Sequence, residues 1–94
     1  MADDRDVLLA RIRGRVQGVS FRIWTRIEAE KLGLTGWVRN EDDGSVTALI
    51  AGRDAAVSTM VKLLWKGPAG ASVSNVAVEK IDPGEIPASF RITS

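Results

Sequence analysis

The sequence predicts an α+β domain in which an antiparallel sheet carries two helices on one face and gains a short extra strand near the C-terminus. Three observations predict this class. Apolar residues alternate in short segments, two other segments have helical spacing, and an Asp-Gly turn joins two strands. The 94 residues are expected to form one domain, because this length supports a single modest core. Residues 1–6 are expected to be a flexible tail.

The first half of the domain begins with a strand expected over residues 7–13. A loop with two glycines follows over residues 14–20, and a helix is expected over residues 21–32, with Ser20 as its N-cap and Gly33 just beyond its end. The apolar residues of this helix fit a buried stripe only loosely: Trp24, Ile27, Ala29 and Leu32.

Residues 36–40 and 45–51 read as the two strands of a hairpin. The segment between them contains Asp43-Gly44, which favours a tight turn because glycine accepts a positive φ. Paired acids beside a turn glycine are more often turn chemistry than a magnesium site, so Asp42 and Asp43 are not expected to bind a metal.

The second helix is expected to begin after Asp54 and to end at Lys66, before Gly67 and Pro68. Its buried stripe has regular helical spacing: Val57, Met60, Val61 and Leu64. Strands over residues 73–81 and 90–92 complete the chain. The order β-α-β-β-α-β with a terminal strand is that of a ferredoxin-like sandwich, a fold that hosts many unrelated activities.

The composition excludes several kinds of chemistry. Cysteine, histidine and tyrosine are absent, so disulfides, thiolate or imidazole metal sites and His-activated nucleophiles are not available. No apolar run is long enough to cross a bilayer, and the acidic N-terminus lacks a signal-type segment, so a cytoplasmic location is expected. An enzyme of this composition must work with arginine, lysine, acids, amides, hydroxyls and backbone groups.

Charge is unevenly distributed along a nearly neutral chain. The net charge is +1, which argues against a general nucleic-acid binder. Five arginines nevertheless fall in one stretch without an acid among them: Arg11, Arg13, Arg15, Arg22 and Arg26. This pattern indicates a small anionic ligand, although solvated surface arginines on a strand and helix would give the same pattern.

The loop before the first helix is the part of the chain where chemistry is expected. Residues 15–20 contain no proline, so every backbone N–H is an available donor, and Gly14 and Gly18 allow these groups to turn inward. The loop leads into a helix N-terminus, which favours an anion, and Arg22 follows in the first turn as a multi-donor partner. From these residues alone, a phosphate site and a structural turn are equally good interpretations.

Two longer motifs resemble those of a known family. The run 14–22, Gly-Arg-Val-Gln-Gly-Val-Ser-Phe-Arg, is similar to the acylphosphatase signature, and residues 36–40, Gly-Trp-Val-Arg-Asn, resemble that family's second motif. Residues 29–34 and 65–68 also have the look of the family, so the similarity extends over nearly the whole chain. The resemblance implies a free-standing acylphosphatase (EC 3.6.1.7), which hydrolyses the anhydride between a carboxylic acid and phosphate.

The resemblance also implies roles for particular residues. Arg22 is expected to be the catalytic phosphate-binding arginine and Asn40 to orient the attacking water. The phosphate cradle is expected to be the backbone N–H groups of Arg15, Val16, Gln17, Gly18, Val19 and Ser20. The expected substrate is a small acyl phosphate, with inorganic phosphate as product and competitive inhibitor, and no metal, cofactor, nucleic acid or membrane is expected to take part. The family resemblance further suggests a monomer.

Other interpretations remain open at this stage. A binding or regulatory module could keep the phosphate cradle without turnover, and a related domain of a larger hydrogenase-maturation protein acts on carbamoyl phosphate. An RNA-binding domain of the same fold would need exposed aromatic residues on its sheet, which this sequence lacks on its first strand.

Several residues also have structural interpretations. Without the motif, Asn40 would be interpreted as a turn residue. Gln17 is expected to cross-link the loop, Phe21 to pack, and Trp37 and Trp65 to anchor the core or its edge.

Overall fold

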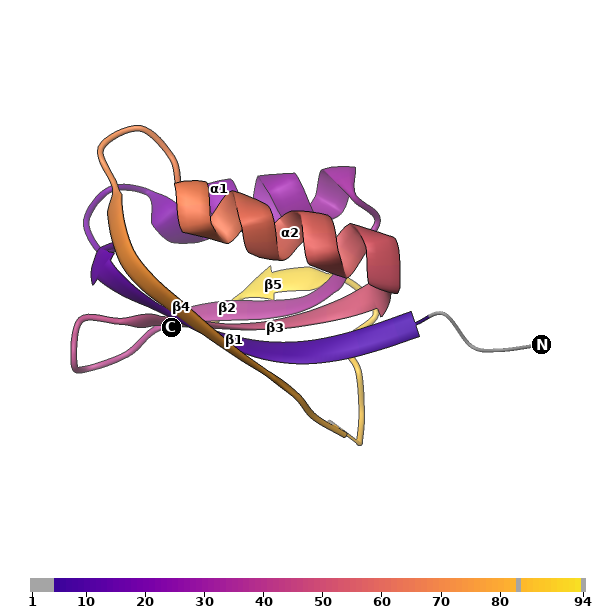
Figure 1. Cartoon of the computed structure of the whole chain (residues 1–94). Coiled ribbons are helices and arrows are strands. Elements are labelled where there is room, and N and C mark those ends of the chain that lie inside the picture. The colour runs from indigo at the N-terminus through magenta and orange to yellow at the C-terminus, as the bar shows by residue number, and fades with distance from the viewer. Residues whose placement is uncertain (1–4, 83, 94) are drawn as a thin grey trace.

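The computed structural model describes residues 5–82 and 84–93. Two helices lie side by side on one face of a sheet, and the other face of the sheet is open (Figure 1). This is the predicted ferredoxin-like arrangement. The strands are β1 (Arg5–Arg15), β2 (Thr35–Asn40), β3 (Val46–Arg53), β4 (Ser72–Lys80) and β5 (Phe90–Ile92), and the helices are α1 (Phe21–Lys31) and α2 (Asp54–Lys66).

The sheet has the order β4-β1-β3-β2-β5. The first four strands in this order pair antiparallel, as the sequence predicts, whereas β5 pairs parallel to β2, with Trp37 opposite Arg91. The added strand therefore makes the sheet mixed. Because β4 lies at one edge, the segment after it must cross the sheet before β5 can join the opposite edge.

The expectation of a flexible tail over residues 1–6 is wrong for the last two of these residues. Arg5 and Asp6 lie in β1, where they pair with Arg53 and Gly52 of β3. Residues 1–4 lie outside the described residues. The first strand is longer than the pattern indicates because backbone pairing continues past the last inward-facing apolar residue at each end.

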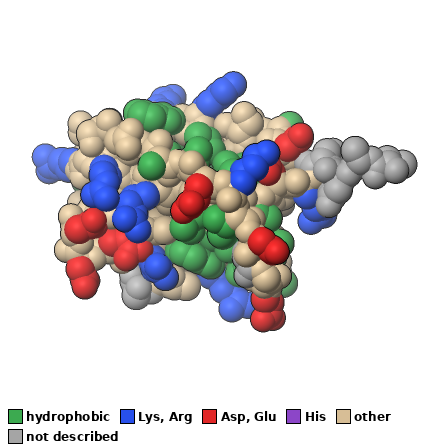
Figure 2. Space-filling view, turned by 60° about the horizontal axis from the view of Figure 1, so that its bottom comes forward, with side chains coloured by type: hydrophobic (Ala, Val, Ile, Leu, Met, Phe, Trp, Pro, Cys, Tyr) green, Lys and Arg blue, Asp and Glu red, His purple; other side chains and the backbone are tan. Residues whose placement is uncertain are grey.

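The core lies between the sheet and the helices. Alternate residues of β1 are buried there, as the sequence predicts. β3 is buried along most of its length because it lies between β1 and β2 in the middle of the sheet. The largest fully buried side chains come from both layers: Phe21, Ile12, Ile50, Met60, Leu64, Val16, Val38, Val46 and Val57. On the open face, hydrophobic side chains gather in the middle and charged side chains surround them (Figure 2).

The buried face of α1 differs from the expected stripe. It consists of Phe21, Thr25 and Ala29, whereas Ile27 is 42% exposed. Thr25 can lie in the core because its hydroxyl donates a hydrogen bond to the Phe21 carbonyl at 2.8 Å, which satisfies its polar group. Trp65, which was expected to anchor the core or its edge, does not lie inside the core, because it is 48% exposed on α2.

Candidate active site

The loop between β1 and α1 leaves the sheet at a bulge. The register of β1 against β4 shifts between Arg13 and Gly14. Gly14 has φ 124°, and a Cβ there would lie 2.2 Å from the Ser72 carbonyl oxygen, so no other residue fits without moving the backbone of β4. The bulge turns the chain away from β4 and starts the loop.

The loop is anchored in the core at its two ends, and the backbone between them has free N–H groups. Val16 and Phe21, at its two ends, are each 1% exposed and belong to the core. Between them the backbone takes positive φ values at Gly18 (76°) and Ser20 (61°). Alternation of this kind turns successive N–H groups toward one side, which is the geometry of an anion-binding nest. No backbone N–H of residues 16–20 donates a hydrogen bond to another described residue.

Ser20 occupies the N-cap position of α1 but does not cap it. Its side chain makes no capping hydrogen bond, and its backbone is left-handed, with φ 61° and ψ 28°. A capping serine needs an extended backbone so that its oxygen reaches the first turn, so the predicted role is wrong on this point. The first helical bond runs from the Trp24 N–H to the Ser20 carbonyl, which leaves the N–H groups of residues 21–23 without a cap.

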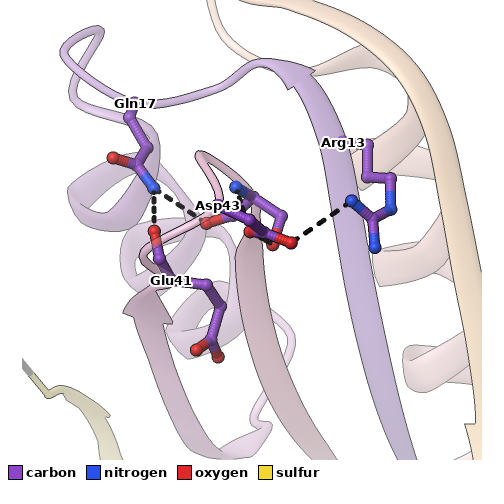
Figure 3. A network of polar contacts seen from close by, with 5 residues as sticks. Arg13, Gln17, Glu41 and Asp43 are labelled. Carbon is purple, nitrogen blue, oxygen red and sulfur yellow. Dashed lines mark hydrogen bonds and ion pairs between the residues drawn. The ribbon is translucent and has the colours of Figure 1, made fainter.

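Gln17 ties the loop to the hairpin that follows Asn40. Its side-chain Nε2 donates to the Glu41 carbonyl at 2.8 Å and to the Ser45 carbonyl at 2.9 Å (Figure 3). The predicted cross-link is confirmed, and its partners are backbone oxygens at the two ends of the turn. These two hydrogen bonds therefore fix the position of the loop relative to the end of β2, although the two segments lie far apart in the sequence.

The turn between β2 and β3 carries acidic side chains that have partners of their own. Asp43 accepts a hydrogen bond from the Ser45 N–H at 2.9 Å, as expected for turn chemistry, and forms an ion pair with Arg13 at 3.3 Å. The contacts with Ser45, and then the Arg13 charge, lower the pKa of Asp43. The carboxylate of Glu41 accepts from Arg39 at 2.9 Å, and this bond lowers the pKa of Glu41. Both acids are therefore neutralised by arginines.

A pocket of about 330 Å³ opens at this junction and brings most of the predicted site together. It is lined by Val16, Gln17, Gly18, Ser20, Phe21, Arg22, Ile23 and Asn40. Of the predicted site residues, Arg15 and Val19 do not line it. Arg15 ends β1 opposite Ser72, and Val19 packs against the core. Ile23 is a lining residue that the sequence analysis did not identify, since nothing in the motifs distinguishes it.

The two polar side chains of the pocket have unused bonding capacity. Arg22 is half-buried and makes no ion pair with a carboxylate of the described residues. Asn40 ends β2 on the same face as buried Val38, so it points toward the helices, and its Oδ1 is buried without a hydrogen-bond partner in the described part of the chain. A buried acceptor left unpaired is costly, which favours a bound water or ligand there.

The lining of the pocket carries a positive charge and no negative one. Arg22 is the only charged residue among those that line it, so no acid opposes an incoming anion. Within residues 5–82 and 84–93, no group of three or more acidic residues is placed to hold a metal ion. Neither helix in that part of the chain is long and apolar enough to cross a membrane.

These features define a small α+β protein with a cationic, backbone-lined pocket at a strand–loop–helix junction. The model of the acylphosphatase family matches residues 8–92. The chain is 67% identical over 93 residues to an acylphosphatase of Rhizobium meliloti (strain 1021), an alignment that covers 99% of this chain and 98% of the relative. The chain therefore belongs to the acylphosphatase family, whose members are enzymes (EC 3.6.1.7).

Solved structures agree with this assignment. An acylphosphatase from Coxiella burnetii superposes with a TM-score of 0.91 at 37% identity, covering 96% of this chain and 94% of that one. An acylphosphatase from Bacillus subtilis gives a TM-score of 0.89 at 34% identity, with 94% and 98% covered. The fold and the family predicted from the sequence are thus confirmed.

Proposed function

We propose that this chain hydrolyses small acyl phosphates in the pocket between the loop and β2. The phosphoryl oxygens are held by the backbone N–H groups of residues 15–20 and by the guanidinium of Arg22, and the attacking water is held by Asn40. The observation that carries the proposal is that one pocket contains both loop N–H groups without a hydrogen-bond acceptor and the unpaired Oδ1 of Asn40.

The reaction suits a site without histidine or metal ligands. Water attacks phosphorus in line, the bond from phosphorus to the acyl oxygen breaks, and its electron pair leaves on the carboxylate. The conjugate acid of that carboxylate has a pKa of roughly 4, so the leaving group needs no general acid. A phosphoryl oxygen takes the proton from water, which gives inorganic phosphate. Positioning and charge stabilisation are what the protein must supply.

Arg22 and Asn40 divide this work. Arg22 offers a planar set of donors to the equatorial oxygens, where charge is concentrated. The Oδ1 of Asn40 accepts a hydrogen bond from the water, which orients a lone pair of the water toward phosphorus. Gln17 supports both by holding the loop against the carbonyls at the two ends of the turn after Asn40.

The same reasoning extends to partners and location. Product and substrate share the phosphoryl group, so inorganic phosphate should inhibit competitively. We propose a monomeric cytoplasmic enzyme that requires neither metal nor cofactor and binds neither nucleic acid nor membranes.

The test is steady-state hydrolysis of acetyl phosphate, with inorganic phosphate as inhibitor. Turnover with purely competitive inhibition supports the proposal. Phosphate binding without turnover would instead identify a regulatory module that keeps the cradle. Non-competitive inhibition would place the anion elsewhere on the protein.

A further inference from the structure

The two residues on either side of Asn40 are bonded to each other on the open face of the sheet. Side chains alternate between the two faces of a strand, so Arg39 projects on the face opposite to Asn40. Glu41 joins it there, because its Oε2 accepts a hydrogen bond from the Arg39 Nε at 2.9 Å. Neither side chain lines the pocket. The ion pair therefore spans the backbone of Asn40 from behind the site.

A second contact orders the side chain of Arg39. Its guanidinium carbon lies 4.7 Å from the ring centroid of Trp37, which precedes it on the open face, so the two form a cation–π contact. An exposed ion pair usually contributes little, because two flexible side chains must be ordered to form it. Here the ring of Trp37 already orders Arg39, so the pair can fix Glu41 at a smaller entropic cost.

The neighbouring strands favour the charged form of Glu41. In the sheet, Arg39 lies opposite Thr47 of β3, and Thr47 lies opposite Arg11 of β1. The contact with Arg39 has the largest effect in lowering the pKa of Glu41, followed by the contact with Thr47. The charge of Arg11 lowers this pKa further. The carboxylate is therefore ionised at neutral pH and attracted to this row of the sheet.

The main chain of Glu41 is bonded on the side of the site. Its carbonyl accepts from the Gln17 Nε2 at 2.8 Å, and its N–H donates to the Ser45 carbonyl at 2.8 Å. The carboxylate of Glu41 lies on the side away from Gln17 (Figure 3). The residue that directly follows Asn40 is thus bonded to the phosphate loop through its backbone and to the open face through its side chain.

We propose that Glu41, through its ion pair with Arg39, is a positioning residue for the hydrolysis. The pair fixes the backbone of Asn40, and with it the place of the attacking water, from the opposite face of the sheet. This inference rests on the proposed function, because it takes Asn40 to hold the water. Without the pair, the end of β2 can shift relative to the phosphate loop, and small displacements of reacting groups lower the rate strongly.

The experiment measures kcat for acetyl phosphate and the competitive inhibition constant of inorganic phosphate. Glu41→Ala should lower kcat by about 3- to 10-fold, a fraction of the roughly 100-fold loss that a misplacement of about 1 Å can cause. The inhibition constant should stay near the wild-type value, because the pair offers no donor to the phosphoryl group. Glu41→Gln keeps an acceptor for Arg39, so it should lower kcat less than Glu41→Ala.

A double variant tests whether Glu41 acts through Arg39. Arg39→Gln removes the charge that holds the carboxylate, so it should also lower kcat. Arg39→Gln combined with Glu41→Ala should lose about as much kcat as Glu41→Ala alone, because each change breaks the same pair.

Glu28→Ala is the matched control. The Glu28 side chain is 22% exposed, against 26% for Glu41, and it also pairs with one cation, Lys31, at 3.2 Å. Glu28 lies on α1 and does not line the pocket. Its replacement should leave kcat and the inhibition constant unchanged. Circular dichroism should show every variant folded, because none of the replaced side chains belongs to the core.

The possible failures are distinguishable. A wild-type chain that does not hydrolyse acetyl phosphate overturns the proposed function, and the inference with it. An active wild-type chain with full kcat in Glu41→Ala overturns the positioning role alone. A loss of phosphate affinity as large as the loss of kcat also overturns it, since Glu41 would then support the phosphate loop and not Asn40. A double variant whose loss equals the product of the single losses would show that the two residues act independently, which overturns the role of the pair.

Discussion

Replacing Gln17 with alanine removes both hydrogen bonds between the phosphate loop and the hairpin turn. Each acceptor keeps another donor, because the Glu41 carbonyl also accepts from the Gly44 N–H at 3.2 Å and the Ser45 carbonyl from the Glu41 N–H at 2.8 Å. Neither carbonyl is left without a hydrogen-bond donor, so the loss of stability should be close to the net contribution of two hydrogen bonds. We expect Gln17→Ala to lower the free energy of unfolding by about 2 kcal/mol.

Urea denaturation measures this loss as a lower midpoint with an unchanged slope. For a domain of this size, about 2 kcal/mol corresponds to a fall in Tm of roughly 8 to 16 °C. Turnover should fall as well, by about 10-fold or more, because the loop is no longer fixed relative to Asn40. Small displacements of reacting groups lower the rate of a reaction strongly. An unchanged midpoint together with an unchanged kcat would refute the role given to Gln17.

Gln17→Glu is the sharper control, since it keeps the size of the side chain. The introduced carboxylate faces two carbonyl oxygens, so this variant should be less stable than Gln17→Ala at neutral pH. The folded state raises the pKa of that carboxyl, so stability should be recovered, relative to wild type, as the pH falls through the raised pKa. Wild-type stability of Gln17→Glu at neutral pH would contradict the observed hydrogen bonds.

Three further predictions concern the backbone, the charges and the metal independence of the site. Ser20 has φ 61°, so Ser20→Gly should keep or raise the free energy of unfolding, by up to about 1 kcal/mol, while Ser20→Val should lower it in the same urea titration. Contacts in the folded state lower the pKa values of Glu41 and Asp43, so their contribution is present above the ordinary carboxyl pKa and lost as pH falls through the lowered one. Stability should therefore fall on acidification below about pH 4, with a weaker pH dependence in Asp43→Asn. Acetyl phosphate hydrolysis should persist in excess EDTA, and a loss restored by Mg²⁺ would contradict a metal-free mechanism.

The local structure around the site could be predicted from the sequence because it depends on residues with few conformational options. Gly14 and Gly18 mark the points where the backbone takes positive φ, and Asp43-Gly44 marks the turn that joins β2 to β3. The alternation in β1 identified its buried face, since one face packs under the helices and the other is open.

Other features depend on contacts between distant segments and were not predicted. The three residues of β5 contain no information on whether they pair parallel or antiparallel with β2. The burial of Thr25 in α1, where Ile27 is exposed, follows from how the helix rests on the sheet, and hydrophobicity alone placed Ile27 in the buried stripe. The partners of Gln17 are backbone carbonyls, which leave no mark in a sequence.

The central claim, that Arg22 holds the phosphoryl group and Asn40 holds the water, is tested most directly by comparing kcat and phosphate affinity in Arg22→Ala and Asn40→Ala. Asn40→Ala should lower kcat by about 10²-fold or more while phosphate affinity stays near the wild-type value. Arg22→Ala should weaken both, with poor rescue by Arg22→Lys because lysine lacks the planar set of donors. Full kcat in Asn40→Ala, or a loss of phosphate affinity as large as that in Arg22→Ala, would contradict this division of roles.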